Sequence, residues 1–156
     1  MMDKTNVMRI LDQAKIPYEG FRYSSELTEG ILIADALGEP REDVYKTLVT
    51  VSGTGTHYVF VIPVEKTLDL KAAARSVGAK SVSMLKQKEL LPTTGYIHGG
   101  CSPIGMKKPF HTVIDSSAQP KEAFFVSAGK VGAQIRVSPT ALAALIGADF
   151  SAIVTA

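Results

Sequence analysis

The chain has 156 residues, of which 46% are hydrophobic and 21% are charged, and its formal net charge is +2. This length suits one domain that buries roughly 70% of the surface of its unfolded chain, so residues 1–156 are predicted to form a single domain. No apolar stretch approaches the ~20 residues that span a membrane. The single cysteine cannot form an internal disulfide, and no signal peptide is evident, so a cytoplasmic protein with no membrane partner is expected.

Charge is distributed unevenly along the chain. Residues 1–45 carry 5 basic and 9 acidic side chains, a net charge of −4, whereas residues 65–108 carry 8 basic and 3 acidic side chains, a net charge of +5. A positive face attracts polyanions such as nucleic acids. The same lysines also suit an ordinary solvated surface, so the charge pattern alone leaves both interpretations open.

The N-terminal part of the chain predicts a mixture of helices and strands. Helices are indicated by apolar residues at helical spacing and by capping residues, and strands by aromatic and β-branched residues. In chain order, the predicted elements are a helix over 7–14 that ends before Pro17, a strand over 18–25, a helix capped by Thr28 and ended by Gly38, a helical turn over 39–43, and a hairpin of strands over 44–53 and 57–64.

The C-terminal part is predicted to be richer in strands. In chain order, the predicted elements are a helix capped by Asp69 and ended by Gly78, a strand over 80–85, a helical turn over 86–91 closed by Pro92, strands over 96–100, 111–115, 123–129 and 133–139, and a helix that begins at Ser138 and Pro139 and ends near Gly147. The mixture has no regular βαβ alternation, so it predicts an irregular α/β or α+β domain around a mixed sheet. The pattern does not decide whether the sheet closes into a barrel.

Lys46 is a charged residue near the start of an apolar strand, in the segment VYKTLVTV. Strand alternation puts its side chain on the same face as Leu48 and Thr50. In a pocket, its ammonium group suits a carboxylate, a phosphate or a carbonyl oxygen. At a sheet edge, a lysine instead hinders aggregation, and the residue pattern leaves both roles open.

The segment YIHGGCSPIG, residues 96–105, contains the tandem glycines Gly99 and Gly100. Such glycines allow positive φ angles and let backbone N–H groups approach a ligand. They also suit an ordinary connection between strands. A second glycine-punctuated turn follows Ser127, and there a plain hairpin is the simpler interpretation.

Cys101 follows the tandem glycines and is a candidate nucleophile. That role requires a base, such as His98 or His111, and a lowered thiol pKa, and a spectator role is the preferred interpretation. The three histidines show no metal-ligand spacing and no CxxC or HExxH motif occurs. We therefore expect no metal and no cofactor.

Three segments occur in the order DVYKTLV, GYIHGGCSPIGMKKPF and VSAGKVGAQIRVSP. Together they resemble the YbaK/EbsC family of trans-acting aminoacyl-tRNA deacylases, which are similar to the editing domain of bacterial prolyl-tRNA synthetases. The resemblance covers about residues 5–147. It implies a mixed, barrel-like β-sheet surrounded by helices, and hydrolysis of the ester that joins a wrong amino acid to the 3′ end of tRNA. Editing is needed because a small synthetase pocket rejects near-isosteres poorly.

The resemblance also implies roles for individual residues. Lys46 would hold the substrate or the terminal adenosine, and Gly99 and Gly100 would donate backbone N–H groups to the developing oxyanion. The implied substrate-binding residues are Tyr23, Thr47, Ser102, Ser127, Gly129 and Gln134. Lys107 and Lys108 are expected to meet tRNA phosphates. In cysteine-specific members of the family, the substrate's own thiol is the implied attacking group.

The expected substrate is Cys-tRNA(Pro), with prolyl-tRNA synthetase as a further candidate partner and with no DNA partner. Gln134 stands where cysteine-specific members carry an aspartate, so a different amino acid such as alanine remains an alternative. Two other hypotheses stay open: a non-catalytic module that binds tRNA or the synthetase, and a thiol enzyme that uses Cys101.

Overall fold

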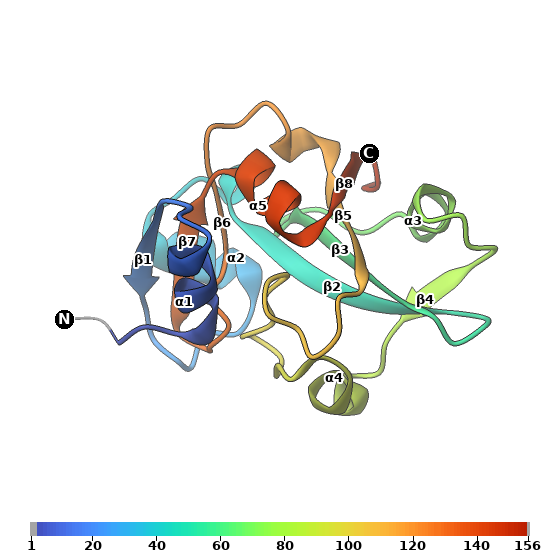
Figure 1. Cartoon of the computed structure of the whole chain (residues 1–156), viewed down its shortest axis with the longest axis horizontal. Coiled ribbons are helices and arrows are strands. Elements are labelled where there is room, and N and C mark those ends of the chain that lie inside the picture. The colour runs from blue at the N-terminus through green and yellow to red at the C-terminus, as the bar shows by residue number, and fades with distance from the viewer. Residues whose placement is uncertain (1–2, 156) are drawn as a thin grey trace.

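The computed structural model describes residues 3–155. Its helices are α1 (Asn6–Gln13), α2 (Gly30–Leu37), α3 (Leu70–Ser76), α4 (Gln87–Thr94) and α5 (Pro139–Ile146), with short 3-10 turns η1 (Arg41–Asp43) and η2 (Ser116–Ala118). Its strands are β1 (Tyr18–Arg22), β2 (Tyr45–Ser52), β3 (His57–Pro63), β4 (Val82–Met84), β5 (His111–Asp115), β6 (Phe124–Ser127), β7 (Ala133–Val137) and β8 (Asp149–Ser151) (Figure 1).

The strands form two sheets. The smaller sheet is antiparallel, with the order β1-β7-β6. The larger sheet has the order β4-β2-β3-β5-β8 and is mixed, because β5 pairs in parallel with β3 and β8. A bridge between Val44 and Phe125 joins the sheets where β2 passes β6. The predicted mixed α/β class is confirmed, and the sheet takes the form of two linked sheets.

Apolar side chains fill the space between the sheets and the helices. The largest core cluster includes Val7 and Leu11 of α1, Leu142 of α5 and residues of both sheets, and α1 and α5 lie in front of the strands in Figure 1. Tyr45 and Phe124 meet in this cluster with their ring centroids 5.0 Å apart. One shared core therefore holds the two sheets together.

Most predicted helix boundaries are confirmed. The side chains of Thr5, Asp69 and Ser138 accept hydrogen bonds from backbone N–H groups at the starts of α1, α3 and α5. The helix α2 differs, because its N-cap is Glu29 and that side chain makes no capping hydrogen bond. Thr28 is therefore not the cap, and its side chain packs against Gly99 instead.

The segment around residues 86–100 departs most from the prediction. Pro92 lies inside α4 and does not end it; the helix continues to Thr94, whose hydroxyl donates to the Leu90 carbonyl over 2.8 Å. The predicted strand over 96–100 is a turn, because the Gly100 N–H donates to the Ile97 carbonyl over 3.0 Å. The short strand β8 was not predicted.

None of the helices within residues 3–155 combines the length and the apolar character that a membrane crossing requires.

Candidate active site

A pocket of about 120 Å³ lies where β2 begins, β6 ends and β7 begins, closed on one side by the loop after α4. Five of the predicted site residues line it: Lys46, Thr47, Gly99, Ser127 and Gln134. Its remaining walls are formed by Thr28, Ile33, Val44, Tyr45, Leu48, Val64, Leu90, His98 and Cys101. Strand pairing accounts for part of this convergence, because Ser127 and Gln134 are opposite one another in the ladder of β6 and β7.

Lys46 enters the pocket from β2, where it pairs with Ile62 of β3. Its side chain is half-buried and has no hydrogen bond or ion pair with any residue in the range 3–155. Burial lowers the pKa of Lys46 below its usual range, since a charged ammonium is poorly solvated there. The ammonium group is therefore available to an anionic or carbonyl ligand.

Three polar side-chain atoms near the pocket are buried without a hydrogen-bond partner in the described chain: Thr47 Oγ1, Gln134 Oε1 and the Tyr23 hydroxyl. Thr47 and Gln134 line the pocket, whereas Tyr23 stands behind Gln134 on the chain that follows β1. Burial raises the pKa of the Tyr23 hydroxyl, and the neighbouring Gln134 amide opposes that rise. Buried polar groups normally find partners, so the atoms of Thr47 and Gln134, which line the pocket, are suited to a polar ligand.

The two glycines of the loop occupy positions that a larger residue would disturb. Gly99 has a φ of +88°, and a β-carbon there would lie 2.8 Å from Thr28 Cγ2. A β-carbon on Gly100 would lie 2.9 Å from the Val131 backbone nitrogen. The loop is thus held between the start of α2 and the turn between β6 and β7.

The glycine N–H groups differ in availability. The Gly100 N–H donates to the Ile97 carbonyl, so it is not free to face a ligand. The predicted donation from Gly100 to an oxyanion would require this hydrogen bond to break. The Gly99 N–H has no partner among residues 3–155. Of the two glycines, Gly99 is the one that both lines the pocket and offers an unused donor.

Cys101 lines the pocket, but its environment is unsuited to a nucleophile. Burial raises the pKa of the thiol to about 12, whereas a reactive cysteine needs a lowered pKa. The side chain makes no hydrogen bond to a base within the described residues. The structure therefore favours the spectator role over the thiol-enzyme hypothesis.

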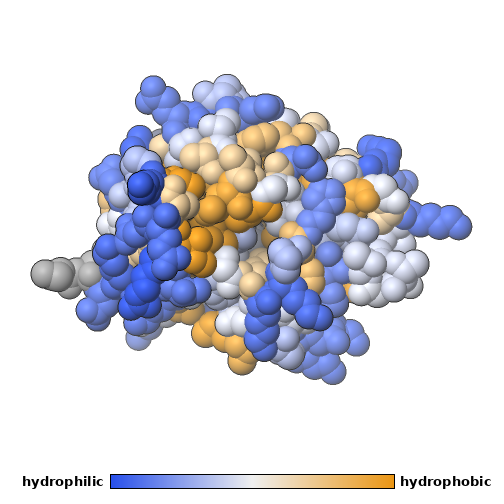
Figure 2. All heavy atoms as spheres, in the orientation of Figure 1, coloured by the Kyte–Doolittle hydropathy of each residue, from blue (hydrophilic) through white to orange (hydrophobic). Residues whose placement is uncertain are grey.

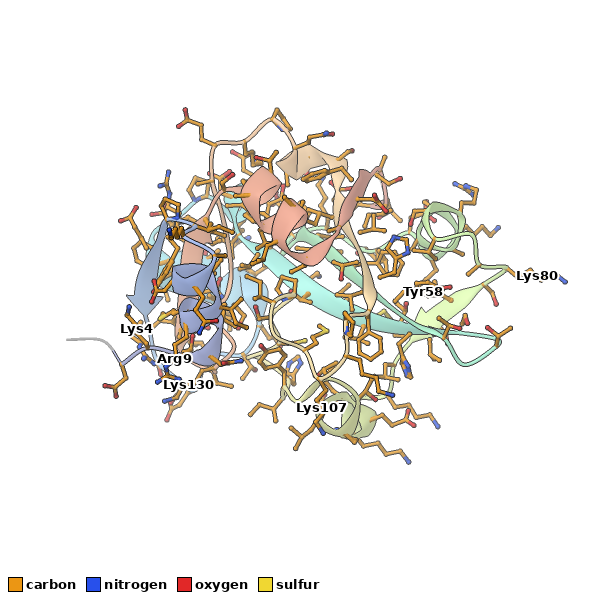
Figure 3. All side chains as sticks on the ribbon, viewed as in Figure 1. Lys4, Arg9, Tyr58, Lys80, Lys107 and Lys130 are labelled. Carbon is orange, nitrogen blue, oxygen red and sulfur yellow. The ribbon has the colours of Figure 1, made fainter. Side chains whose placement is uncertain are left out.

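The other predicted residues lie outside the pocket lining. Ser102 is fully buried, and its hydroxyl accepts from the Ile104 N–H over 3.3 Å, which stabilises the turn. Gly129, with a φ of +90°, packs against Val7 and Tyr96. Lys107 and Lys108 are exposed, and Lys107 lies next to α4 in Figure 3, so their contact with tRNA stays a prediction.

Several pocket residues were not predicted from the sequence. Thr28 and Leu90 come from the start of α2 and from α4, and no local pattern marks either as a pocket residue because only the fold brings these elements to β2. His98 was considered only as a base for Cys101. The position of His98 next to Gly99 in the sequence was the signal that could have placed it in the same wall of the pocket.

Comparison with known proteins identifies the family. Residues 32–145 match the family model described as "Aminoacyl-tRNA editing domain". The chain belongs to this family of editing domains. A relative from Enterococcus faecalis, "Putative Cys-tRNA(Pro)/Cys-tRNA(Cys) deacylase EbsC", is 46% identical over 154 residues, which cover 97% of this chain and 94% of the relative. The predicted family and its class of activity, editing of aminoacyl-tRNA, are confirmed.

Solved structures share the fold of this editing domain. "Crystal structure of a putative trans-editing enzyme for prolyl tRNA synthetase" matches with a TM-score of 0.82 and 23% identity, covering 99% of this chain and 100% of that one. "Crystal structure of hypothetical protein APE2540" matches with a TM-score of 0.88 and 21% identity, covering 96% and 99% of the two chains. The likeness extends over nearly the whole chain.

The chemistry of editing fits the contents of the pocket. Hydrolysis of an aminoacyl ester passes through a tetrahedral oxyanion, which preorganised N–H donors and cations stabilise. The editing domain offers an unpaired ammonium on Lys46 and an unused N–H on Gly99 in one small cavity. Among residues 3–155, no three His, Cys, Asp or Glu side chains are grouped to hold a metal ion.

Proposed function

We propose that this editing domain acts in trans on Cys-tRNA(Pro) and hydrolyses the ester between cysteine and the terminal ribose. The observation that carries the proposal is the convergence of Lys46, Gly99 and Gln134 in one pocket of about 120 Å³. That volume suits a small amino acid. The name of the 46% identical relative, which includes Cys-tRNA(Pro), supports the choice of cysteine.

Each group has a specific role in the proposed reaction. The Gly99 N–H donates to the oxyanion, and the Lys46 ammonium holds the carbonyl oxygen or the terminal adenosine. The Oε1 atom of Gln134 accepts a hydrogen bond from the ammonium or thiol of the substrate, and Thr47 and Ser127 complete the polar wall. Gln134 is neutral, so it orients the ammonium group of the substrate without forming an ion pair.

The attacking group belongs to the substrate. The cysteinyl thiol attacks its own ester carbonyl, the bond between the carbonyl carbon and the ribose oxygen breaks, and the ribose oxygen takes up a proton. The cyclic thioester that leaves is opened by water. The protein supplies position and electrostatic stabilisation, which accords with the raised pKa of the Cys101 thiol.

The decisive experiment is deacylation of a panel of charged tRNAs: Cys-tRNA(Pro), Ala-tRNA(Pro), Cys-tRNA(Cys) and Pro-tRNA(Pro). We expect the fastest turnover with Cys-tRNA(Pro). Preference for Ala-tRNA(Pro) would replace cysteine by alanine as the substrate, an alternative that the small pocket and the neutral Gln134 also suit. Turnover of no member above its spontaneous rate would overturn the proposal.

We also propose that tRNA(Pro) is the tRNA partner and that prolyl-tRNA synthetase delivers it. The pocket is of a size to select the amino acid, so a synthetase is a natural source of selectivity for the tRNA body. Added synthetase should then increase the preference for tRNA(Pro) over tRNA(Cys) carrying the same amino acid. An unchanged preference would show that the synthetase is not required.

A further inference from the structure

A groove of about 380 Å³ lies directly beside the pocket. We call it the loop groove, because one side is formed by Tyr96, Ile97 and Gly100 and the other by Gly129, Lys130 and Val131. It is larger than the pocket, and of the predicted site residues only Gly100 and Gly129 line it. One of its walls belongs to the loop after α4, which also closes the pocket.

The loop groove and the pocket lie on the same loop. Gly99 lines the pocket and the next residue, Gly100, lines the groove, so the two cavities are separated by the thickness of one backbone segment. The close approach of Gly100 to the backbone of Val131 packs the two loops together at this point. A ligand bound at Gly99 therefore has the groove one residue further along the same loop.

The groove combines apolar walls with positive charge. Ile97 lines the groove and is 54% exposed. The face of the molecule shown in Figure 2 carries apolar patches, one of them at its lower edge next to hydrophilic side chains. Lys130 lines the groove and is exposed. Lys107 is not a lining residue; its Cγ lies 3.3 Å from where a β-carbon on Gly95 would be, and its ammonium group donates to the Pro92 carbonyl over 3.4 Å. No acidic side chain is among the lining residues.

We propose that the loop groove binds the nucleotide that precedes the terminal adenosine of the aminoacyl-tRNA, an inference that rests on the proposed function. The base lies between Tyr96, Ile97 and Val131, and its phosphate meets Lys130. Unpaired bases are bound in this way, by apolar or aromatic side chains with cations along the backbone. When the ester carbonyl sits at Gly99, the chain on the 5′ side of the ribose must continue onto the adjoining surface.

The assignment gives the groove a role in substrate selection. A free amino acid ester or a metabolite lacks the second nucleotide, so it gains nothing from the groove. An aminoacyl-tRNA gains contacts that are remote from the ester and that hold the reacting carbonyl in place. The groove thereby distinguishes the end of a tRNA from other small esters.

The test compares three cysteinyl esters that differ in length: 3′-O-cysteinyl adenosine, the cysteinyl ester of cytidylyl-adenosine, and Cys-tRNA(Pro). For the unmodified protein we expect kcat/KM to rise when the cytidine is added. In Ile97→Ser and in Lys130→Ala, that gain should fall about tenfold, as loss of one base or phosphate contact predicts. The dependence of log KM on log salt for Cys-tRNA(Pro) should become shallower by about 0.7 in Lys130→Ala.

Matched controls are Leu70→Ser and Lys80→Ala. Leu70 is 41% exposed on α3, and Figure 3 shows Lys80 at the end of the molecule opposite Lys130. Both controls should keep the full gain from the added cytidine. The same gain in the groove variants as in the controls would overturn the proposal.

A binding measurement separates this inference from the proposed function. Fluorescence anisotropy with an uncharged RNA oligonucleotide ending in CCA needs no hydrolysis. Weaker binding by Ile97→Ser than by Leu70→Ser supports the groove even if no ester is turned over, in which case the proposed reaction fails alone. Equal binding by the two variants refutes the groove even if all three esters are hydrolysed.

Discussion

At the scale of single residues, Lys46 shows how folding prepares a functional group. Its position near the start of β2 brings an ammonium into a half-buried pocket without an ionic partner in the described chain. Burial of an unpaired charge costs free energy, and this cost lowers the stability of the folded state. A group kept at such a cost is well suited to a role in binding or catalysis.

Lys46→Met should therefore separate function from stability. We expect kcat/KM for editing to fall at least about 100-fold, as with the loss of an electrostatic stabiliser. The melting temperature at pH 7 should rise slightly, because the pKa of Lys46 is lower in the folded state than in the unfolded state, so the protonated side chain opposes folding. That advantage should shrink as the pH rises toward 10.5, where the unfolded lysine also loses its proton.

Deacylation assays and thermal melts at several pH values measure both effects. Lys46→Arg is the matched control that keeps the positive charge. Normal turnover by Lys46→Met would remove Lys46 from the site, and a lower melting temperature at pH 7 would contradict the cost of its burial.

Cys101→Ser tests the rival thiol mechanism. Because burial raises the pKa of this thiol to about 12, almost none of it is thiolate at neutral pH. We expect turnover of Cys-tRNA(Pro) to stay within about threefold of the unmodified protein, an allowance for packing changes at a buried site. The variant Cys101→Ala controls for the effect of the serine hydroxyl at this buried position. If both variants lose far more activity than this threefold allowance, Cys101 is again a candidate catalytic group.

At the scale of elements, the loop after α4 determines the shape of the site. Gly99 needs its positive φ and its close contact with Thr28, and Gly100 needs its close contact with Val131. These contacts join α2, the loop, and the turn between β6 and β7. The loop therefore acts as a rigid wall between the pocket and the groove.

Gly99→Ala should disturb that wall. A β-carbon would lie within 3.2 Å of three atoms of Thr28, and alanine is also strained at a φ of +88°. We expect the free energy of unfolding to fall by about 2 kcal/mol and kcat to fall by about 10- to 100-fold, because small displacements of positioned groups are costly. Urea denaturation and single-turnover deacylation measure the two effects.

Gly55→Ala is the control for backbone strain. Gly55 has a similar φ of +85°, lies in the turn between β2 and β3, and has open space around its β-carbon position. The Gly55→Ala variant should lose about 1 kcal/mol of its free energy of unfolding and keep the turnover of the unmodified protein. If both variants kept full activity, the rigid wall would have no part in catalysis.

At the scale of the whole molecule, one core links the two sheets. Phe124 of β6 is fully buried and packs edge-on against Tyr45 of β2, while the backbone connection between the sheets includes the bridge of Val44 and Phe125. The hydroxyl of Tyr45 also lies 2.7 Å from that of Ser117. The sheets should consequently unfold together.

Phe124→Ala should lower the free energy of unfolding by about 3–5 kcal/mol, the usual cost of a large cavity in a core. Urea denaturation followed by both far-UV circular dichroism and tyrosine fluorescence should still show one shared transition. Leu32→Ala, at a residue that is 47% exposed on α2, should change the free energy by less than about 0.5 kcal/mol. Two separate transitions in the Phe124 variant would show that the sheets fold independently.

Local patterns in the sequence were sufficient for most elements of this protein. Capping side chains at Thr5, Asp69 and Ser138, and the glycines after α2 and α5, mark helix ends through contacts a few residues long. The hairpin of β2 and β3 is likewise encoded by β-branched residues and a short turn. The order and spacing of the motifs that contain Lys46, Gly99 and Ser127 also sufficed to predict the editing family.

The tertiary structure decided what depends on distant contacts. Thr28 packs against Gly99, 71 residues away in the chain, and Gly100 packs against Val131. Three further features follow from such contacts. They are the free N–H of Gly99 as opposed to the bonded N–H of Gly100, the high thiol pKa of Cys101, and the groove beside the pocket. Hydrogen bonding, desolvation and the shape of a cavity depend on which segments meet, and residue types along a chain do not specify that without the fold.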